Sequence, residues 1–221
     1  MEYPTKLLLV YFSVRGRAQA LRYLLEYLQL PYEEKKYDVN DWEEWSEKDK
    51  KTLPTAFPNL PYLKDGEKVV TETETIFLYL CKKAGRKDLF GKTEDDEFDI
   101  STTRWVINDL NTYIGELVYD PDFEKKRDEI LEEKIAPKLS QLSTFLGKKE
   151  YLHGYLTYVD FLLYELIEII QRMKSDFLDK YENLKEFQKN FAEQKFMKDY
   201  ISSKRYIARP FYGYAVWNPY D

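Results

Sequence analysis

The sequence predicts a small α/β domain followed by an all-helical domain, and three observations carry this prediction. Strand-length apolar runs alternate with helical patterns, but only within the first eighty-odd residues. After Gly85 the strand pattern disappears, and the composition changes over Gly85–Lys92, which we interpret as a linker. We therefore expect an α/β domain over residues 1–85 and an all-α domain over residues 93–221.

Within the first domain, the order of elements reads β-α-β-α-β-β-α. The first apolar run has the length of a strand, and the next segment repeats its apolar residues every three or four positions, as a helix does. An Asp65-Gly66 pair between two later apolar runs is typical of a hairpin. The predicted elements are a strand at Lys6–Phe12, a helix that begins after Val14 and stops before Pro31, an edge strand at Tyr32–Tyr37, a short helix and loop at Asp41–Lys51, two strands within Tyr62–Val70, and a helix at Thr73–Lys83.

The second domain shows only helical patterns. Residues 94–147 read as two long helices broken near Asp120-Pro121, and helices return at 157–173 and 183–203. Thr157 as N-cap and Asp160 three residues later form a variant of the capping box, worth about 1 kcal/mol. We assign both residues a structural role.

Composition and charge exclude several classes of function. The 221 residues carry a net charge of −6 without a long basic stripe, so the electrostatic footprint of a nucleic-acid-binding protein is missing. No apolar run reaches the length of a membrane span, and the start of the chain lacks the apolar core of a secretion signal. A single cysteine, Cys81, and a single histidine offer neither a disulfide nor a metal site. We expect a cytoplasmic protein without bound metal, nucleic-acid partner or membrane partner.

A peptide-binding pocket is predicted by the segment around Pro61. This proline ends an irregular stretch and opens a short apolar strand, a setting that favours a cis bond. The backbone N–H and C=O of Leu60 would then face outward, unpaired by the sheet. Glu72 and Thr73 stand where a helix begins, and a helix N-terminus favours a carboxylate ligand. A peptide-binding loop beside an anion-binding helix start describes a pocket for glutathione.

Several short motifs occur in order along nearly the whole chain, and each of them alone is weak. They are Tyr11–Gly16 (YFSVRG), Leu24–Tyr27 (LLEY), Tyr32–Tyr37 (YEEKKY), Phe57–Leu63 (FPNLPYL), Tyr119–Glu124 (YDPDFE), Val159–Leu162 (VDFL) and the tail from Ser202 to Trp217. In this combination the sequence resembles cytosolic glutathione S-transferases, most of all those of the mu class.

The resemblance implies a thioredoxin-like domain joined to an all-α domain, working as a homodimer in detoxification. Glutathione is then a co-substrate, no cofactor stays bound, and the glutathione thiolate attacks a hydrophobic electrophile. Tyr11 takes the position of the catalytic tyrosine, whose phenolic O–H donates to the sulfur. Lowering the thiol pKa by roughly two units requires about 2.7 kcal/mol. The alternative is a non-catalytic ligand-binding or structural protein on the same scaffold, and with 20 tyrosines in the chain Tyr11 alone would read as an ordinary strand-end aromatic.

Other site residues follow from the resemblance position by position. With Tyr11, the predicted glutathione-binding residues are Phe12, Trp45, Lys50 (or Lys48, because the spacing differs by one), Asn59, Leu60, Glu72, Thr73 and, toward a neighbouring subunit, Asp109. The predicted electrophile pocket consists of Val14, Tyr119, Phe211 and Trp217, and Phe57 matches the aromatic residue that inserts into the partner subunit. Asp109 and Trp217 are equally compatible with ordinary packing or surface positions.

The chain departs from the mu pattern at the end of the site expected to hold the glycyl residue of glutathione. Phe12 replaces a tryptophan, Trp42 stands where an arginine is expected, and the segment between Tyr37 and Trp45 is short. Glu72 replaces the usual glutamine. These departures leave a mu-class and a sigma-like assignment both open.

Overall fold

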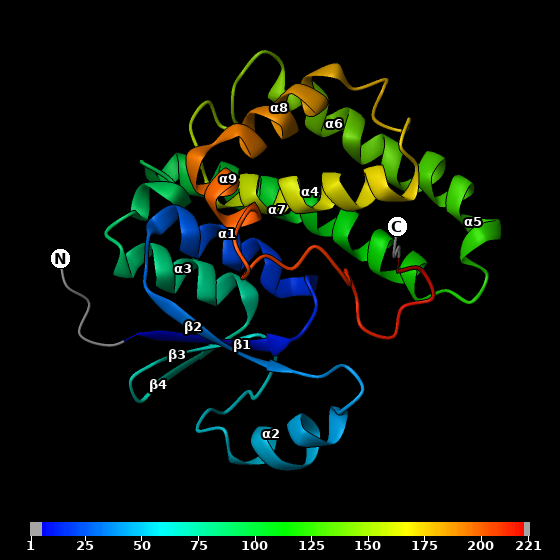
Figure 1. The fold of residues 1–221 in the computed structure, drawn as a ribbon. Coiled ribbons are helices and arrows are strands. Elements are labelled where there is room, and N and C mark those ends of the chain that lie inside the picture. The colour runs from blue at the N-terminus through cyan, green and yellow to red at the C-terminus, as the bar shows by residue number, and fades with distance from the viewer. Residues whose placement is uncertain (1–5, 219–221) are drawn as a thin grey trace. The chain divides into compact units, whose positions relative to one another are not determined.

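The computed structural model describes residues 6–218 and divides the chain into two compact units. The first unit comprises the chain up to Arg86 together with Asp199–Gly213, and the second comprises Lys87–Lys198 together with the segment from Tyr214. Figure 1 shows the sheet in the first unit and the helices of the second. The small mixed sheet and the helical remainder confirm the predicted fold class.

The first unit contains a four-stranded sheet in the order β2-β1-β3-β4 (Figure 1). Strand β1 (Leu7–Phe12) pairs in parallel with β2 (Tyr32–Tyr37), and it pairs antiparallel with β3 (Tyr62–Asp65). Strand β4 (Lys68–Thr71) closes the hairpin with β3. The central position of β1 explains its nearly continuous apolar sequence, because both of its faces are covered.

Helices α1 (Gln19–Leu28) and α3 (Thr73–Lys83) cover one face of the sheet (Figure 1). Each buries an apolar stripe at helical spacing, such as Leu21 with Leu25 on α1 and Phe77 with Cys81 on α3. Cys81 is a buried core residue, as predicted from its position in an apolar helix.

An aromatic cluster covers the opposite face of the sheet. The segment Glu44–Asp49, which continues into α2 (Lys50–Thr52), places Trp45 against the sheet. Trp45 stacks on Tyr62 with ring centroids 6.0 Å apart and lies 5.8 Å from the ring of Tyr37. The Tyr37 hydroxyl and the Lys35 ammonium both bind the Asp49 carboxylate, at 2.5 and 2.6 Å. These contacts fix the 44–52 segment to strand β2.

The described residues of the second unit form helices joined by loops, with no strand among them. Helix α4 ends at Val118, just before the break predicted near Asp120-Pro121. The helices are α4 (Glu94–Val118), α5 (Phe123–Ile130), α6 (Ala136–Leu146), α7 (Tyr158–Met173), α8 (Glu182–Glu193) and α9 (Lys195–Ile201), with a wider turn at Leu131–Ile135 between α5 and α6.

The capping box at the start of α7 is confirmed and lies in the core of this unit. The Asp160 carboxylate accepts hydrogen bonds from the Thr157 N–H and the Thr157 hydroxyl, both at 2.8 Å. It also accepts one from the Leu152 N–H at 3.0 Å, which ties the preceding loop to the helix start. Asp160 is fully buried, because α7 is apolar on most of its faces.

The C-terminal segment Asp199–Gly213 belongs to the first unit, although the sequence placed it in the helical domain. Its anchors combine the buried rings of Tyr200 and Phe211 with specific polar contacts. The Arg205 guanidinium forms an ion pair with Glu26 on α1, and the Arg15 guanidinium donates to the Tyr206 hydroxyl at 2.9 Å. The Arg15 guanidinium carbon also lies 4.5 Å from the centroid of the Phe211 ring, which adds a cation–π interaction. Such pairs join positions far apart in the sequence, so periodicity does not reveal them.

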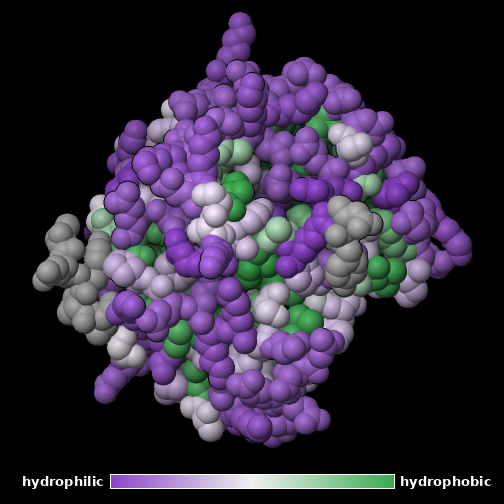
Figure 2. Space-filling view, viewed as in Figure 1, coloured by the Kyte–Doolittle hydropathy of each residue, from purple (hydrophilic) through white to green (hydrophobic). Residues whose placement is uncertain are grey.

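Hydrophilic side chains dominate the face drawn in Figure 2, in keeping with the charged fraction of 33%. Within residues 6–218, the structure contains no helix with both the length and the apolar character needed to cross a bilayer.

Removing the buried cap should destabilise the protein more than removing an exposed one. We expect Asp160→Ala to lower the free energy of unfolding by about 2–4 kcal/mol, because buried N–H groups lose their acceptor. Asp96 forms the equivalent box with Thr93 at the exposed start of α4. There water replaces the lost acceptor, so Asp96→Ala should cost only about 1 kcal/mol. Urea unfolding of both variants measures the difference, and equal losses would contradict the role assigned to burial.

Candidate functional site

Tyr11 lies near the end of β1, facing the start of the first helical segment. The Arg17 backbone N–H donates a hydrogen bond to the Tyr11 hydroxyl oxygen at 3.2 Å. Gly16 allows this approach for two reasons. Its φ of +40° lies in the left-handed region, and a Cβ added there would stand 2.7 Å from the Tyr11 hydroxyl oxygen. The hydroxyl therefore accepts from the protein and keeps its own proton to donate elsewhere.

The surroundings keep the Tyr11 phenol protonated. Burial raises the pKa of Tyr11 above the usual value of 10.0, while the Arg17 N–H and the charges of Arg17 and Arg22 oppose that rise. The phenol is therefore a neutral O–H donor at physiological pH. A hydrogen bond to a negatively charged acceptor is roughly twice as strong as one between neutral groups.

The segment predicted to bind a peptide has the expected backbone conformation but differs from the prediction in one hydrogen bond. The Leu60–Pro61 bond is cis, as predicted. The Leu60 N–H is not unoccupied, however, because it donates to the side-chain oxygen of Asn59 at 2.9 Å. The side-chain amide of Asn59 in turn donates to the Glu72 carboxylate at 3.0 Å. A ligand that binds the Leu60 N–H must displace the Asn59 side chain, a competition that sequence reasoning missed.

Glu72 and Thr73 form the start of α3, as predicted. Glu72 adopts a left-handed backbone with φ of +67°, unusual for a residue other than glycine, and its carbonyl accepts the first helical hydrogen bond from Ile76. Unusual φ values are retained where the surrounding structure requires them, often at binding sites. The exposed Glu72 carboxylate and the N–H groups of the first turn of α3 lie side by side, which suits a group carrying both an ammonium and a carboxylate.

Aromatic side chains dominate the end of the site that is predicted to hold the glycyl residue of glutathione. Phe12 stacks on Trp42 with centroids 5.5 Å apart and planes 15° apart, and Trp42 remains 50% exposed. Trp45 is only 2% exposed, so it supports the site from the core, and its direct contact with a ligand stays a prediction. Lys48 and Lys50 are both exposed, and the choice between them stays open.

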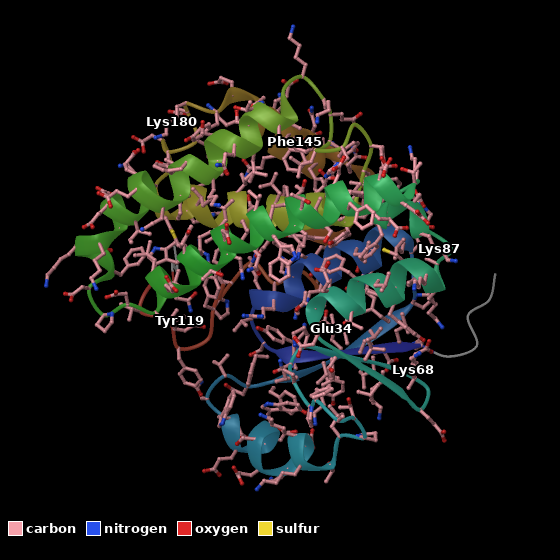
Figure 3. All side chains as sticks on the ribbon, turned by 180° about the vertical axis from the view of Figure 1, so that it is seen from behind. Glu34, Lys68, Lys87, Tyr119, Phe145 and Lys180 are labelled. Carbon is pink, nitrogen blue, oxygen red and sulfur yellow. The ribbon has the colours of Figure 1, made fainter. Side chains whose placement is uncertain are left out.

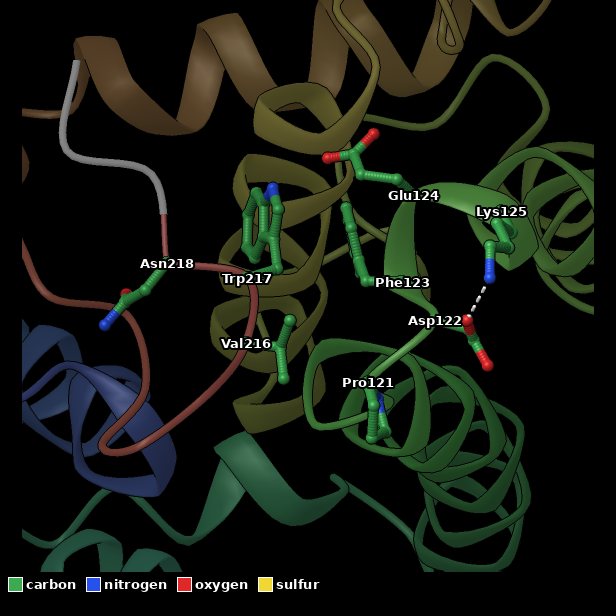
Figure 4. A pocket seen from close by; sticks show the side chains of 8 residues that line it. All are labelled: Pro121, Asp122, Phe123, Glu124, Lys125, Val216, Trp217 and Asn218. Carbon is green, nitrogen blue, oxygen red and sulfur yellow. Dashed lines mark hydrogen bonds and ion pairs between the residues drawn. The ribbon is translucent and has the colours of Figure 1, made fainter.

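The predicted residues of the second unit lie in other surroundings. Asp109 on α4 forms an ion pair with Lys138 at 2.7 Å. Tyr119, labelled in Figure 3, follows the end of α4 and is 49% exposed. Trp217 stacks on Phe123 at 5.8 Å, and the two rings line an open pocket of about 450 Å³ with the α4–α5 turn (Figure 4).

Of the four predicted electrophile-binding residues, Trp217 alone lines this pocket of the second unit. Val14 and Phe211 belong to the first unit, where they are 3% and 2% exposed. Their role in binding an electrophile, like that of Tyr119, stays a prediction. Among residues 6–218, no group of three or more histidine, cysteine, aspartate or glutamate side chains is arranged to hold a metal ion.

Comparison with known families identifies the family to which the chain belongs. Residues 8–82 match the family described as glutathione S-transferase, N-terminal domain, and residues 108–204 match glutathione S-transferase, C-terminal domain. The chain belongs to the glutathione S-transferase family. Its fold is the thioredoxin-like domain and helical domain of that family, and its enzyme class is that of these transferases.

Curated relatives place this transferase near the mu class. It is 36% identical over 215 residues to glutathione S-transferase Mu 2 of Mus musculus, covering 95% of this chain and 97% of the relative. It is 35% identical over 217 residues to glutathione S-transferase Mu 1 of Homo sapiens, covering 96% and 98%. A solved structure titled "rat hPGDS complexed with a quinoline" superposes with a TM-score of 0.77 at 28% identity, covering 89% of this chain and 96% of that one. The transferase is therefore mu-like.

Substituting Gly16 should damage the site more than the fold. A Cβ at this position meets the Tyr11 hydroxyl, so we expect Gly16→Ala to displace the phenol and to lower glutathione-dependent activity by at least about tenfold. Gly66 provides a matched control, because its φ is +60° but no atom lies within 4 Å of an added Cβ. Both variants carry the backbone penalty of about 1–2 kcal/mol, measurable by thermal unfolding. Equal activity of the two variants would contradict this assignment of Gly16.

Proposed function

We propose that this protein conjugates the glutathione thiolate to hydrophobic electrophiles, with Tyr11 as the catalytic residue. The observation that carries the proposal is the Tyr11 hydroxyl, whose oxygen accepts from the Arg17 N–H at 3.2 Å and whose pKa is raised by burial. A neutral phenol held in this way donates its proton toward a ligand. Glutathione is the co-substrate, and the relatives' names identify them as transferases of this peptide.

The chemistry requires stabilisation of a sulfur anion rather than a base on the protein. Donation by the Tyr11 O–H lowers the free energy of the thiolate relative to the thiol, and two units of thiol pKa correspond to about 2.7 kcal/mol. A charge-assisted hydrogen bond supplies on the order of 1.5–3 kcal/mol. The thiol proton leaves to solvent on binding. The thiolate then attacks an electrophilic carbon, forms the C–S bond and expels the leaving group or adds across a double bond.

The remaining contacts would orient the peptide across the sheet edge. Leu60 offers its backbone groups to the cysteinyl residue once Asn59 has moved aside. Thr73 and the first turn of α3 receive the γ-glutamyl carboxylate, while the Glu72 carboxylate receives the ammonium. Lys50 or Lys48 would pair with the glycyl carboxylate, with Phe12 and Trp45 nearby. Such exposed ion pairs are worth only about 0–1 kcal/mol.

We further propose a homodimer that acts in detoxification in the cytoplasm. Phe57 supports the dimer, because its ring is 77% exposed in the segment before β3, and insertion into a partner subunit would remove this apolar surface from water. In the dimer, Asp109 of one subunit would approach the glutathione site of the other. Val14, Tyr119, Phe211 and Trp217 would contact the electrophile.

The pH dependence of the reaction should identify the titrating group. The raised pKa of Tyr11 keeps the phenol protonated until the pH exceeds 10, so its donation is constant between pH 5 and 9. The rate should rise with pH as bound glutathione ionises, with a midpoint about two units below that of a free thiol. In Tyr11→Phe this midpoint should move up toward about 8.5.

At pH 6.5 the rate of Tyr11→Phe should be on the order of tenfold lower than that of the wild type. The loss of thiolate is larger than this, but the thiolate that remains is more basic and therefore more nucleophilic, which offsets part of the loss. Conjugation of a chlorinated nitrobenzene measures both profiles. Superimposable profiles would remove Tyr11 from the mechanism. A wild type without activity would favour the non-catalytic binding protein.

Replacing Phe57 should shift the protein from dimer to monomer. We expect Phe57→Ser to weaken association at least about a hundredfold, because a buried aromatic anchor is lost. Analytical ultracentrifugation over a range of concentrations measures the shift. Tyr214→Ser, which removes another exposed aromatic ring, should leave association unchanged. A dimer unaffected by the first change would refute the assigned contact.

A further inference from the structure

Arg22 on α1 is a buried cation beneath the loop that follows Tyr11. Its side chain is 0% exposed, and its Nε donates to both oxygens of the Glu34 carboxylate at 3.2 Å. Glu34, labelled in Figure 3, lies on β2. A buried ion pair of this kind is weak evidence for stability, because desolvation offsets the attraction. The remaining contacts of the guanidinium therefore become informative.

Arg22 binds two consecutive peptide groups of the Tyr11 loop (residues 13–17). Its Nη1 donates to the Val14 carbonyl at 2.9 Å and makes a longer contact with the Arg15 carbonyl at 3.4 Å, and it also donates to the Gln19 side-chain oxygen at 3.2 Å. The N–H groups of the same two peptide units, those of Arg15 and Gly16, donate to the carbonyls of Pro210 and Phe211 at 2.9 and 2.8 Å. Each of the two peptide planes is thus bonded at both of its ends, by Arg22 on one side and by the C-terminal segment on the other.

The next peptide unit carries the N–H that meets the catalytic phenol. It joins Gly16 to Arg17, and the Arg17 N–H donates to Tyr11 at 3.2 Å. Peptide planes are rigid, so only φ and ψ of Gly16 separate this N–H from the two planes before it. Holding those planes restricts the directions that the N–H can take and so supports the hydrogen bond to the Tyr11 hydroxyl. The positive charge of Arg22 also opposes the rise in the pKa of Tyr11, which places the two groups within electrostatic reach.

We propose that Arg22 is a positioning residue for thiolate formation, acting through the carbonyls of Val14 and Arg15 on the hydrogen bond between Arg17 and Tyr11. The inference rests on the proposed function of Tyr11. In this proposal Arg22 does not bind the sulfur itself. Its effect is transmitted by the Tyr11 loop, and the C-terminal segment completes the arrangement from the other side.

The decisive variant is Arg22→Lys, with Glu34→Gln as its control. Lysine keeps the charge, but its compact ammonium lacks the planar fork by which Arg22 bonds Glu34 through Nε and the loop carbonyls through Nη1. The pKa of bound glutathione, followed by the ultraviolet absorbance of the thiolate, should rise by roughly half a unit to one unit, a three- to tenfold loss of thiolate below the midpoint. Glu34→Gln removes the ion pair but leaves Arg22 on the loop carbonyls, so it should lower the melting temperature without raising the thiol pKa.

A double variant separates positioning from general damage. In the Tyr11→Phe background, Arg22→Lys should no longer change the thiol pKa, because the group it positions is absent. A thiol pKa in Arg22→Lys equal to wild type, an equal rise in Glu34→Gln, or an undiminished effect in the Tyr11→Phe background would each overturn the inference.

Thermal melts of each variant ensure that every titration is done below its unfolding transition. If the Arg22→Lys protein does not fold, Arg22→Gln replaces it, because glutamine keeps a neutral donor for the Val14 carbonyl. If Tyr11→Phe raises the thiol pKa while Arg22→Lys does not, the proposed function stands and the role of Arg22 fails. If glutathione bound to the wild type has the same thiol pKa as free glutathione, the proposed function is refuted and this inference fails with it.

Discussion

The hydrogen bond from the Arg17 N–H to the Tyr11 hydroxyl is the interaction on which the site depends. It uses one of the N–H groups that every helix start leaves unpaired, and it occupies the acceptor side of the phenol. The proton of the phenol is then available to a ligand. Burial prevents the phenol from ionising, so the same environment that orients the donor also preserves it.

The mixed sheet supplies the frame for this arrangement. Strand β1 is central, and its Val10 belongs to the aromatic cluster around Trp45, while the Tyr11 hydroxyl meets the Arg17 N–H of the first helical segment. The antiparallel strand β3 brings the cis Leu60–Pro61 bond to the same sheet. The start of α3 follows directly after β4, which places Glu72 within hydrogen-bonding distance of Asn59. Short connections thus bring together residues from three parts of the sequence.

The groups proposed to bind the peptide already bond to one another, so the proposed binding is an exchange of hydrogen bonds. The Asn59 side chain occupies the Leu60 N–H and links it to Glu72. A peptide that takes these groups replaces protein hydrogen bonds with its own, so each exchange contributes little net free energy. In the proposed complex, affinity would then depend on the groups that lack such substitutes, above all the sulfur that we propose to lie beside Tyr11.

The sequence by itself determined the two-part organisation, the order of strands and helices, the cis proline, the capping box of α7 and the motif that singles out Tyr11. These features depend on local patterns or on neighbouring residues, which a single chain displays directly. The tertiary structure alone decided that Arg22 binds the Val14 carbonyl, that Pro210 binds the Arg15 N–H, and that Trp45 is buried. These contacts join side chains and backbone groups that are distant in sequence or follow no period, because their partners meet only when the sheet and the C-terminal segment have packed.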